Sequence, residues 1–274
     1  MITKLPSTRT SATTITKGNT VAETIALQDL APLLKRLRLS AVMPCLKTQI
    51  EDTDNSSRPY LELVYELLTE EVARRTEKAL ARRLSDAAVR HADACMSQID
   101  YKSPRGLRKA QLQTLGNCDW IRAHQNCIIT GATGCGKTWI ASALTNAACR
   151  QGFRARFIRV PRLLKNMAAA YQLDHGFEKE LRELKKMDLL VLDDWGIGQM
   201  DALGRSDLLE IIEERYDNGS TLITSVLPVD KWAEYIGDAT YADSILDRIV
   251  RKAHRIEMHG DSMREQEKYG AVKK

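Results

Sequence analysis

A glycine-rich stretch near the middle of the chain constrains its fold more than any other feature. Apolar residues 127–130 predict a strand, Gly131–Thr138 follows the spacing G-x-x-x-x-G-K-T, and the alanine-rich segment 139–150 predicts a helix. A strand, a glycine loop and a helix in this order form the phosphate-binding P-loop. Glycines let backbone N–H groups curl around a phosphate, and the start of the helix adds partial positive charge. The alternative is a chance turn, but such a turn would not need a strand before it and a helix after it. We therefore predict a nucleotide site.

The residue types of the loop indicate what each position does. Lys137 is expected to reach the β- and γ-phosphates, and the Thr138 hydroxyl is expected to ligate Mg²⁺. ATP and Mg²⁺ are therefore the predicted cofactors. The residues expected to surround the phosphates are Gly131, Ala132, Thr133, Gly134, Cys135, Gly136, Lys137 and Thr138.

The composition is that of a soluble globular protein. Of 274 residues, 43% are hydrophobic and 28% are charged, and no apolar run approaches the length that spans a membrane. The six cysteines form no C-x-x-C pair, which argues against a disulfide framework or a zinc site and favours a reducing cytoplasm. The net charge of +5 is weak evidence for a nucleic-acid partner by itself.

The pattern along the chain predicts three regions: a polar, flexible leader over residues 1–25, a helical N-terminal domain over 26–104 and a nucleotide-binding domain over 105–274. Residues 26–50 have helical periodicity and should break at Pro44, and a longer helix should follow Pro59. The turn signal Ser103–Gly106 marks the boundary. Strands and helices alternate after it, so we predict an α/β fold with a parallel sheet.

Two carboxylates end a further strand, which covers residues 188–194 and is apolar from Leu189 to Leu192. Because ligands bind beyond the carboxyl ends of parallel strands, Asp193 is expected to hold Mg²⁺ and Asp194 to orient or deprotonate the attacking water. The alternative is an aspartate that caps the next element. Thr224 and Ser225 end a further strand and could touch the γ-phosphate, although such hydroxyls more often cap helices.

Basic residues recur at a spacing of four along the helix predicted after Pro59, at Arg74, Lys78 and Arg82. They could form a stripe that follows a phosphate backbone. The alternative is a solvated helix face whose charge is balanced by nearby glutamates.

These motifs together resemble the AAA+ ATPases, and more narrowly the IstB-type ATPase helpers of insertion-sequence transposases, which are related to the DnaC helicase loaders. The resemblance extends roughly from Leu37 to Arg264. The stretches that carry it include Pro104–Leu107, Asp119–Ile121, Leu192–Gly196, Asp207–Glu213, Leu227–Trp232, Ala242–Arg248, Ala253–Ile256 and Ser262–Arg264.

The resemblance implies a three-layer αβα AAA+ domain, preceded by a small all-α domain. Many AAA+ proteins also carry a C-terminal helical lid, and we expect none here because few residues follow Met258. It implies an ATPase that forms a homo-oligomeric ring or filament on double-stranded DNA and recruits and activates a partner transposase. We expect its turnover to be slow and stimulated by DNA. Arg248 is the expected arginine finger, with Arg251 as the alternative. A strand is also predicted over residues 154–160, the second of the core, and by the same analogy DNA should meet the basic residues Arg159, Arg162 and Lys165 at its end and beyond it.

One departure concerns Val226, which stands where the family usually has Gln or Asn, so a polar sensor role would fall to Ser225 or Thr224. Two other functions stay open. A DnaC-like replicative helicase loader would share the ATPase core. A nucleotide-gated scaffold with negligible turnover is the second, because Asp194 replaces the commoner Glu and its shorter side chain holds water less closely.

Overall fold

The computed structural model describes residues 27–52, 58–260 and 262–263, so the predicted leader lies outside the described residues. The chain divides into two compact units, Met1–Arg74 and Arg75–Lys274, and the division falls within one long helix, α3 (Tyr60–Ala87).

The first unit is helical. It contains α1 (Leu27–Arg36), α2 (Val42–Glu51) and the first part of α3. The helix predicted over residues 26–50 is wrong in one respect, because it is interrupted at 37–41 and not at Pro44. Arg38 adopts a left-handed φ of 58°, which ends the first helix. Pro44 lies in the first turn of α2, where a helix has no use for the missing N–H.

A buried carboxylate joins the helices of the first unit. Glu71 of α3 accepts a hydrogen bond of 2.8 Å from the backbone N–H of Ala41, at the start of α2. Gln49 of α2 donates to the carbonyl of Leu63 at 3.1 Å. These contacts satisfy polar groups that the helix termini and packing would otherwise leave without partners.

The second unit begins at Arg75, well before the domain boundary expected at residue 104. The reason is the packing of the second half of α3. Leu80 and Leu84 contact the hydrophobic core of the unit, and Ala87 is fully buried in it. Arg83 also donates a hydrogen bond of 2.9 Å to the carbonyl of Cys149. Residues 75–104 therefore pack with the sheet domain.

The core of the second unit is a parallel sheet of five strands in the order β2-β3-β4-β1-β5, which confirms the predicted α/β class. All five carboxyl ends therefore lie along one edge of the sheet. The strands are β1 (Asn126–Gly131), β2 (Ala155–Arg159), β3 (Leu189–Trp195), β4 (Ser220–Ser225) and β5 (Ala253–Met258).

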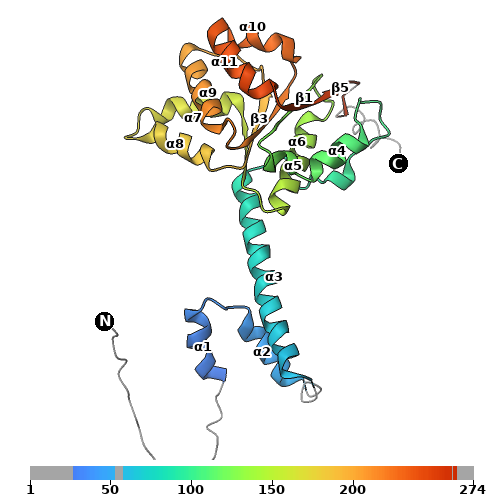
Figure 1. The fold of residues 1–274 in the computed structure, drawn as a ribbon, viewed down its shortest axis with the longest axis vertical. Coiled ribbons are helices and arrows are strands. Elements are labelled where there is room, and N and C mark those ends of the chain that lie inside the picture. Colours follow the sequence, from blue (N-terminus) through green and yellow to red (C-terminus); the bar gives the residue numbers. More distant parts are fainter. Residues whose placement is uncertain (1–26, 53–57, 261, 264–274) are drawn as a thin grey trace, which may run out of the picture. The chain divides into compact units, whose positions relative to one another are not determined.

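Helices cover both faces of this sheet, as Figure 1 shows. Leu189, Leu190, Val191 and Leu192 of β3 are all 0% exposed, which explains why this strand is apolar at every position. One face carries η2 (Met96–Gln98), α4 (Lys109–Gly116), α5 (Asp119–Arg122) and α6 (Lys137–Arg150). The other carries α7 (Val160–Ala170), α8 (Gly176–Lys185), α9 (Ala202–Arg215), η3 (Val229–Lys231), α10 (Trp232–Ile236) and α11 (Ala239–Val250).

Within the described residues, no helix combines the length and the apolar character needed to cross a bilayer.

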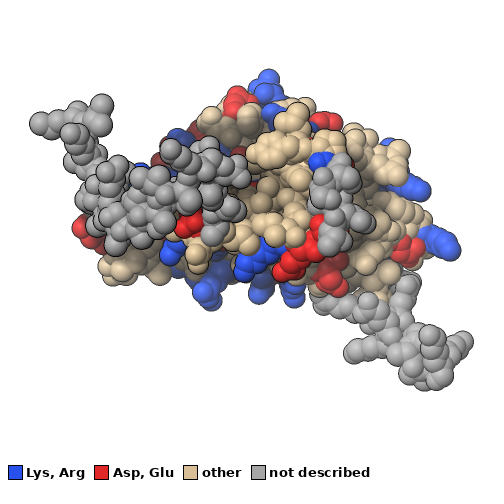
Figure 2. Space-filling model, turned by 90° about the horizontal axis from the view of Figure 1, so that it is seen from below, with Lys and Arg blue, Asp and Glu red and all other residues tan. Residues whose placement is uncertain are grey.

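On the face seen in Figure 2, basic and acidic side chains are interspersed. Charge alone therefore does not mark a track for a nucleic-acid backbone on that face.

Candidate nucleotide-binding site

The predicted P-loop joins the end of β1 at Gly131 to the start of α6 at Lys137. Its glycines are needed for space as well as for backbone freedom. At Gly131, where φ is +148°, a Cβ would collide with the carbonyl oxygen of Met258 in β5. At Gly134, where φ is +88°, a Cβ would collide with the side chain of Ser262. The loop is therefore held between α6 and the segment at the end of β5.

The two polar residues at the start of α6 lie at the carboxyl edge of the sheet. The ammonium group of Lys137 donates to the carbonyls of Gly131 and Ala132, both at 2.8 Å, and its side chain is buried. The Thr138 hydroxyl donates to Oδ1 of Asp193 at 3.0 Å. The motif residues of β1–α6 and β3 are thus brought together, as the sequence predicts.

Asp193 is 0% exposed and has two different carboxylate oxygens. Its Oδ1 accepts hydrogen bonds from the hydroxyls of Thr138 and Thr224, whereas its Oδ2 is buried without a hydrogen-bond partner. A buried carboxylate oxygen beside a threonine hydroxyl fits the oxygen ligands that Mg²⁺ prefers. Among the described residues there is no cluster of three or more His, Cys, Asp or Glu, so phosphates and water would complete such a site.

Asp194 follows at an irregularity in the pairing of β3 with β4, and its φ of 59° is left-handed. Such a bulge turns a side chain out of the regular pleat. Its Oδ2 accepts a hydrogen bond of 2.5 Å from Nε of Arg159, at the end of β2. Its side chain is only 20% exposed, whereas that of Arg159 is 54% exposed. An arginine predicted to bind DNA is therefore the ion-pair partner of the carboxylate predicted to act on water.

The two hydroxyls at the end of β4 differ in what they contact. Thr224 donates to Asp193 and accepts a hydrogen bond of 3.3 Å from the backbone N–H of Asp194. Ser225 is fully buried, donates to the carbonyl of Trp195 at 2.9 Å and accepts from the N–H of Leu227 at 3.0 Å. Thr224 therefore lies beside both carboxylates, and Ser225 ties the end of β4 to β3.

Arg248 lies at the opposite edge of the sheet from the P-loop. Its carbonyl accepts a hydrogen bond of 3.1 Å from the side chain of Asn126, the first residue of β1, and its guanidinium is 2.5 Å from Glu213. β1 itself separates Asn126 from Gly131, a rise of about 17 Å at roughly 3.3 Å per residue. Arg248 and the alternative, Arg251 at the end of the same helix, are thus remote from the phosphate loop of their own chain.

The remaining basic candidates occupy two helices. Lys78 and Arg82 are exposed on α3, where Arg82 is 3.5 Å from Asp86, and Arg74 donates to the Ser40 hydroxyl within the first unit. Arg162 and Lys165 are exposed on α7. Because α7 follows β2 directly, Arg162 lies in the first turn of the helix, just after Arg159, and Lys165 lies about one turn further on.

A cavity of about 580 Å³ lies beside the P-loop. Two arginines that line it, Arg90 and Arg105, were not predicted from the sequence as site residues. Arg105 is buried and donates to the carbonyl of Cys135 at 3.2 Å, so it supports the loop from below. Arg90 reaches Asp193, with 3.9 Å between its guanidinium and Oδ2. The position of Arg105 beside a glycine, in the turn Ser103–Gly106, could have indicated a role near the loop. No pattern in the sequence indicates such a role for Arg90.

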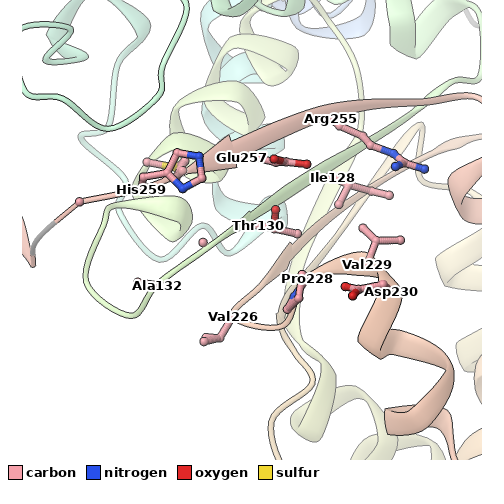
Figure 3. Close-up of a pocket in the computed structure, with 13 residues that line it drawn as sticks. Ile128, Thr130, Ala132, Val226, Pro228, Val229, Asp230, Arg255, Glu257 and His259 are labelled. Atoms are coloured by element: carbon pink, nitrogen blue, oxygen red, sulfur yellow. The ribbon is translucent and has the colours of Figure 1, made fainter.

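A second cavity, of about 670 Å³, lies beside the loop where β1 and β5 end (Figure 3). Ile128 and Thr130 of β1 and Arg255 and Glu257 of β5 form one wall, and the segment 226–230 after β4 forms the other. Acidic, basic and apolar side chains are mixed in this lining, so it has no single chemical character.

A family model described as IstB-like ATP binding protein matches residues 32–271, which is most of the chain. The chain belongs to this family. A relative in Sinorhizobium fredii, which carries the name insertion sequence ATP-binding protein y4pL, is 42% identical over 84% of this chain and 94% of its own length. A Mycobacterium tuberculosis protein, named as an ATP-binding protein in an insertion sequence, is 33% identical over 86% of this chain and 94% of its own.

Solved structures that resemble this IstB-like chain share its fold. The structure of DnaI has a TM-score of 0.53 and 22% identity, and covers 61% of this chain and 91% of its own. The DnaC helicase loader also has a TM-score of 0.53, with 20% identity, and covers 62% of this chain and 99% of its own. The predicted AAA+ fold with a P-loop and an N-terminal helical region is therefore confirmed, and the chain is an ATP-binding protein of the IstB-like family.

Proposed function

We propose that this IstB-like protein is an ATP-hydrolysing, DNA-binding regulator of transposition in the cytoplasm. It assembles as a homo-oligomeric ring or filament on double-stranded DNA, and recruits and activates a partner transposase. The proposal draws on the names of its relatives, which place them in insertion sequences, and on the arrangement of the nucleotide site.

The observation that carries the proposal is the separation of Arg248 from the P-loop. An arginine that stabilises charge on the γ-phosphate must contact that phosphate. Arg248 lies at the amino-terminal edge of the sheet, beside Asn126, whereas the loop lies at the carboxyl edge. As the proposed finger, Arg248 can therefore act only on the nucleotide of a neighbouring copy, and ATP then joins subunits into an assembly.

Within one subunit, the side chains around the loop have distinct roles. Lys137 and the backbone of Gly131–Thr138 bind the phosphates, and the Thr138 hydroxyl and the Asp193 carboxylate hold Mg²⁺. Bound Mg²⁺ supplies positive charge that neutralises the phosphate oxygens. Thr224 orients Asp193 through its hydroxyl, and Asp194 orients or deprotonates the attacking water. Ser225 acts through the backbone of Trp195 and fixes the strand end that carries both carboxylates.

DNA binding is assigned to basic side chains outside the nucleotide cavity. Arg159 ends β2 beside Asp194, and Arg162 and Lys165 follow it in the first turns of α7. Arg74, Lys78 and Arg82 lie along α3 and add charge for phosphate contacts. Neutralising any of these residues should lower both the DNA affinity and its dependence on salt.

The test combines phosphate release, assembly and pull-down. Wild-type protein should release phosphate slowly with Mg²⁺ and ATP, faster with double-stranded DNA, and form ATP-dependent assemblies visible by electron microscopy. Lys137→Ala should abolish ATP binding, and Asp194→Asn should bind ATP without turnover. A monomer that ignores DNA in every nucleotide state would refute the proposal.

Two outcomes of the same test would favour the other functions. Capture of a replicative helicase instead of the transposase would indicate a helicase loader. Assembly on DNA with no phosphate release above the Asp194→Asn background would indicate a nucleotide-gated scaffold.

A further inference from the structure

Only one of the two carboxylate oxygens of Asp193 accepts hydrogen bonds. Oδ1 accepts from two hydroxyls, but Oδ2 is buried with no hydrogen-bond partner, and the carboxylate is 0% exposed. A buried carboxylate is strongly destabilising unless a cation lies close to it. The ion-pair partner in the structure is Arg90, whose guanidinium is 3.9 Å from Oδ2. This separation is too long for a hydrogen bond, so Arg90 neutralises Asp193 without being locked to it.

Arg90 is carried by a segment that the P-loop helix itself holds in place. After α3 ends at Ala87, Ala88 adopts a left-handed φ of 51° and turns the chain. The side-chain amide of Asn146, a buried residue of α6, then donates to the carbonyls of His91, Ala92 and Ala94 at 3.3, 3.2 and 2.9 Å. Because α6 begins at the P-loop, one helix positions both the phosphate loop and the backbone of Arg90.

Arg90 borders the cavity in which the phosphates are expected. Arg90 and His91 line this cavity of about 580 Å³ together with Gly134, Lys137 and Thr138. The side chain of Arg90 is 48% exposed, so it has room to rotate about a fixed backbone. Arginine presents five N–H donors in a planar fork, which suits phosphate oxygens as well as carboxylates.

We propose that Arg90 is a phosphate-binding residue of the nucleotide site and exchanges one anionic partner for another. It neutralises Asp193, and it turns to the phosphates of a bound nucleotide when Asp193 engages Mg²⁺. The driving force is electrostatic, because a metal ion at Asp193 repels the guanidinium while the phosphates attract it. This inference rests on the nucleotide-binding part of the proposed function and does not require DNA, a transposase or hydrolysis.

Two readouts separate the two contacts of Arg90. The first is the free energy of unfolding without nucleotide, measured by urea denaturation. The second is the dissociation constant for a ribose-labelled fluorescent ATP, measured at saturating Mg²⁺, so that the metal occupies Asp193 where that carboxylate is present. Both are measured for wild type, Arg90→Ala, Asp193→Asn and the double variant.

We expect Arg90→Ala to be less stable than wild type when Asp193 is present, and to cause no such loss in the Asp193→Asn background. In contrast, we expect Arg90→Ala to weaken binding of the labelled ATP by about tenfold in both backgrounds, because one charge-assisted phosphate contact is lost. Arg90→Lys keeps the charge but not the fork, so its affinity should be intermediate. It also provides a folded variant if Arg90→Ala does not fold.

Arg154→Ala is the matched control. Arg154 is 57% exposed and lies 3.7 Å from Asp188, a similar pair at the opposite edge of the sheet. If Arg90→Ala binds labelled ATP as tightly as Arg154→Ala does, Arg90 is only the partner of Asp193 and the inference is overturned. If wild type itself does not bind labelled ATP, the proposed function fails instead.

Discussion

Replacing Arg159 with alanine tests how the candidate base Asp194 is controlled. The Arg159 guanidinium is 2.5 Å from the Asp194 carboxylate. The left-handed φ of Asp194 turns this side chain out of the regular pleat of the strand. A carboxylate held in an ion pair must leave it before it can accept a proton from water. Arg159→Ala removes this step, so we expect hydrolysis without DNA to become faster.

The size of the effect follows from the exposure of the pair. Asp194 is 20% exposed and Arg159 54% exposed, so solvent screens the interaction and a value of about 0.5–1 kcal/mol is appropriate. Because 1.36 kcal/mol corresponds to a tenfold change in rate, releasing Asp194 should raise turnover by about two- to fivefold. If DNA phosphates compete for Arg159 in the wild type, DNA should add little further stimulation in the variant.

The assay is phosphate release at saturating ATP and Mg²⁺, with and without double-stranded DNA. Arg156→Ala is the control, because Arg156 is exposed on the same strand and donates to the carbonyl of Asp86 instead of a carboxylate. An unchanged or slower rate for Arg159→Ala without DNA would show that Arg159 supports Asp194 and does not restrain it.

Three further changes probe the loop, the buried carboxylate and the thiols. Thr224→Val removes one of the two hydroxyls that donate to the buried Asp193 carboxylate, so the free energy of unfolding in urea should fall by about 1–3 kcal/mol. Gly131→Ala should weaken binding of fluorescent ATP, whereas Gly198→Ala, which shares the positive φ but adds its methyl to open space, should not. A hydrogen bond with a serine hydroxyl lowers the pKa of Cys95, and burial raises the pKa of Cys127 to about 12. A thiol reagent at pH 8 should therefore modify Cys95 first, and a fast phase that survives Cys95→Ser would contradict this order.

The motif residues could be placed from the sequence because spacing and strand direction determine where they lie. Lys137 and Thr138 follow an unmistakable loop, and Asp193 follows a strand whose apolar run shows that both faces are covered. Parallel pairing then brings the carboxyl ends of β1, β3 and β4 to one edge. The contact of Thr138 with Asp193 is a direct consequence.

Other features of the structure could not be predicted from periodic patterns in the sequence. Arg90 lies in an irregular segment whose course depends on three hydrogen bonds from Asn146, a residue distant in sequence. The choice between Thr224 and Ser225 depends on the irregular pairing of β3 with β4, which no pattern in either strand reveals. The break after α1 depends on Arg38, a non-glycine residue that adopts a left-handed φ.

The placement of Arg248 and the P-loop at opposite edges of one sheet has a consequence for any assembly that joins them between copies. Such a contact is head-to-tail, so an open row of subunits has two unlike ends. One end presents an arginine with no nucleotide to meet, and the other presents a nucleotide with no arginine. A short row therefore has a larger share of incomplete sites than a long one, and activity per subunit should rise with length. A closed ring has no ends, and all of its sites are complete.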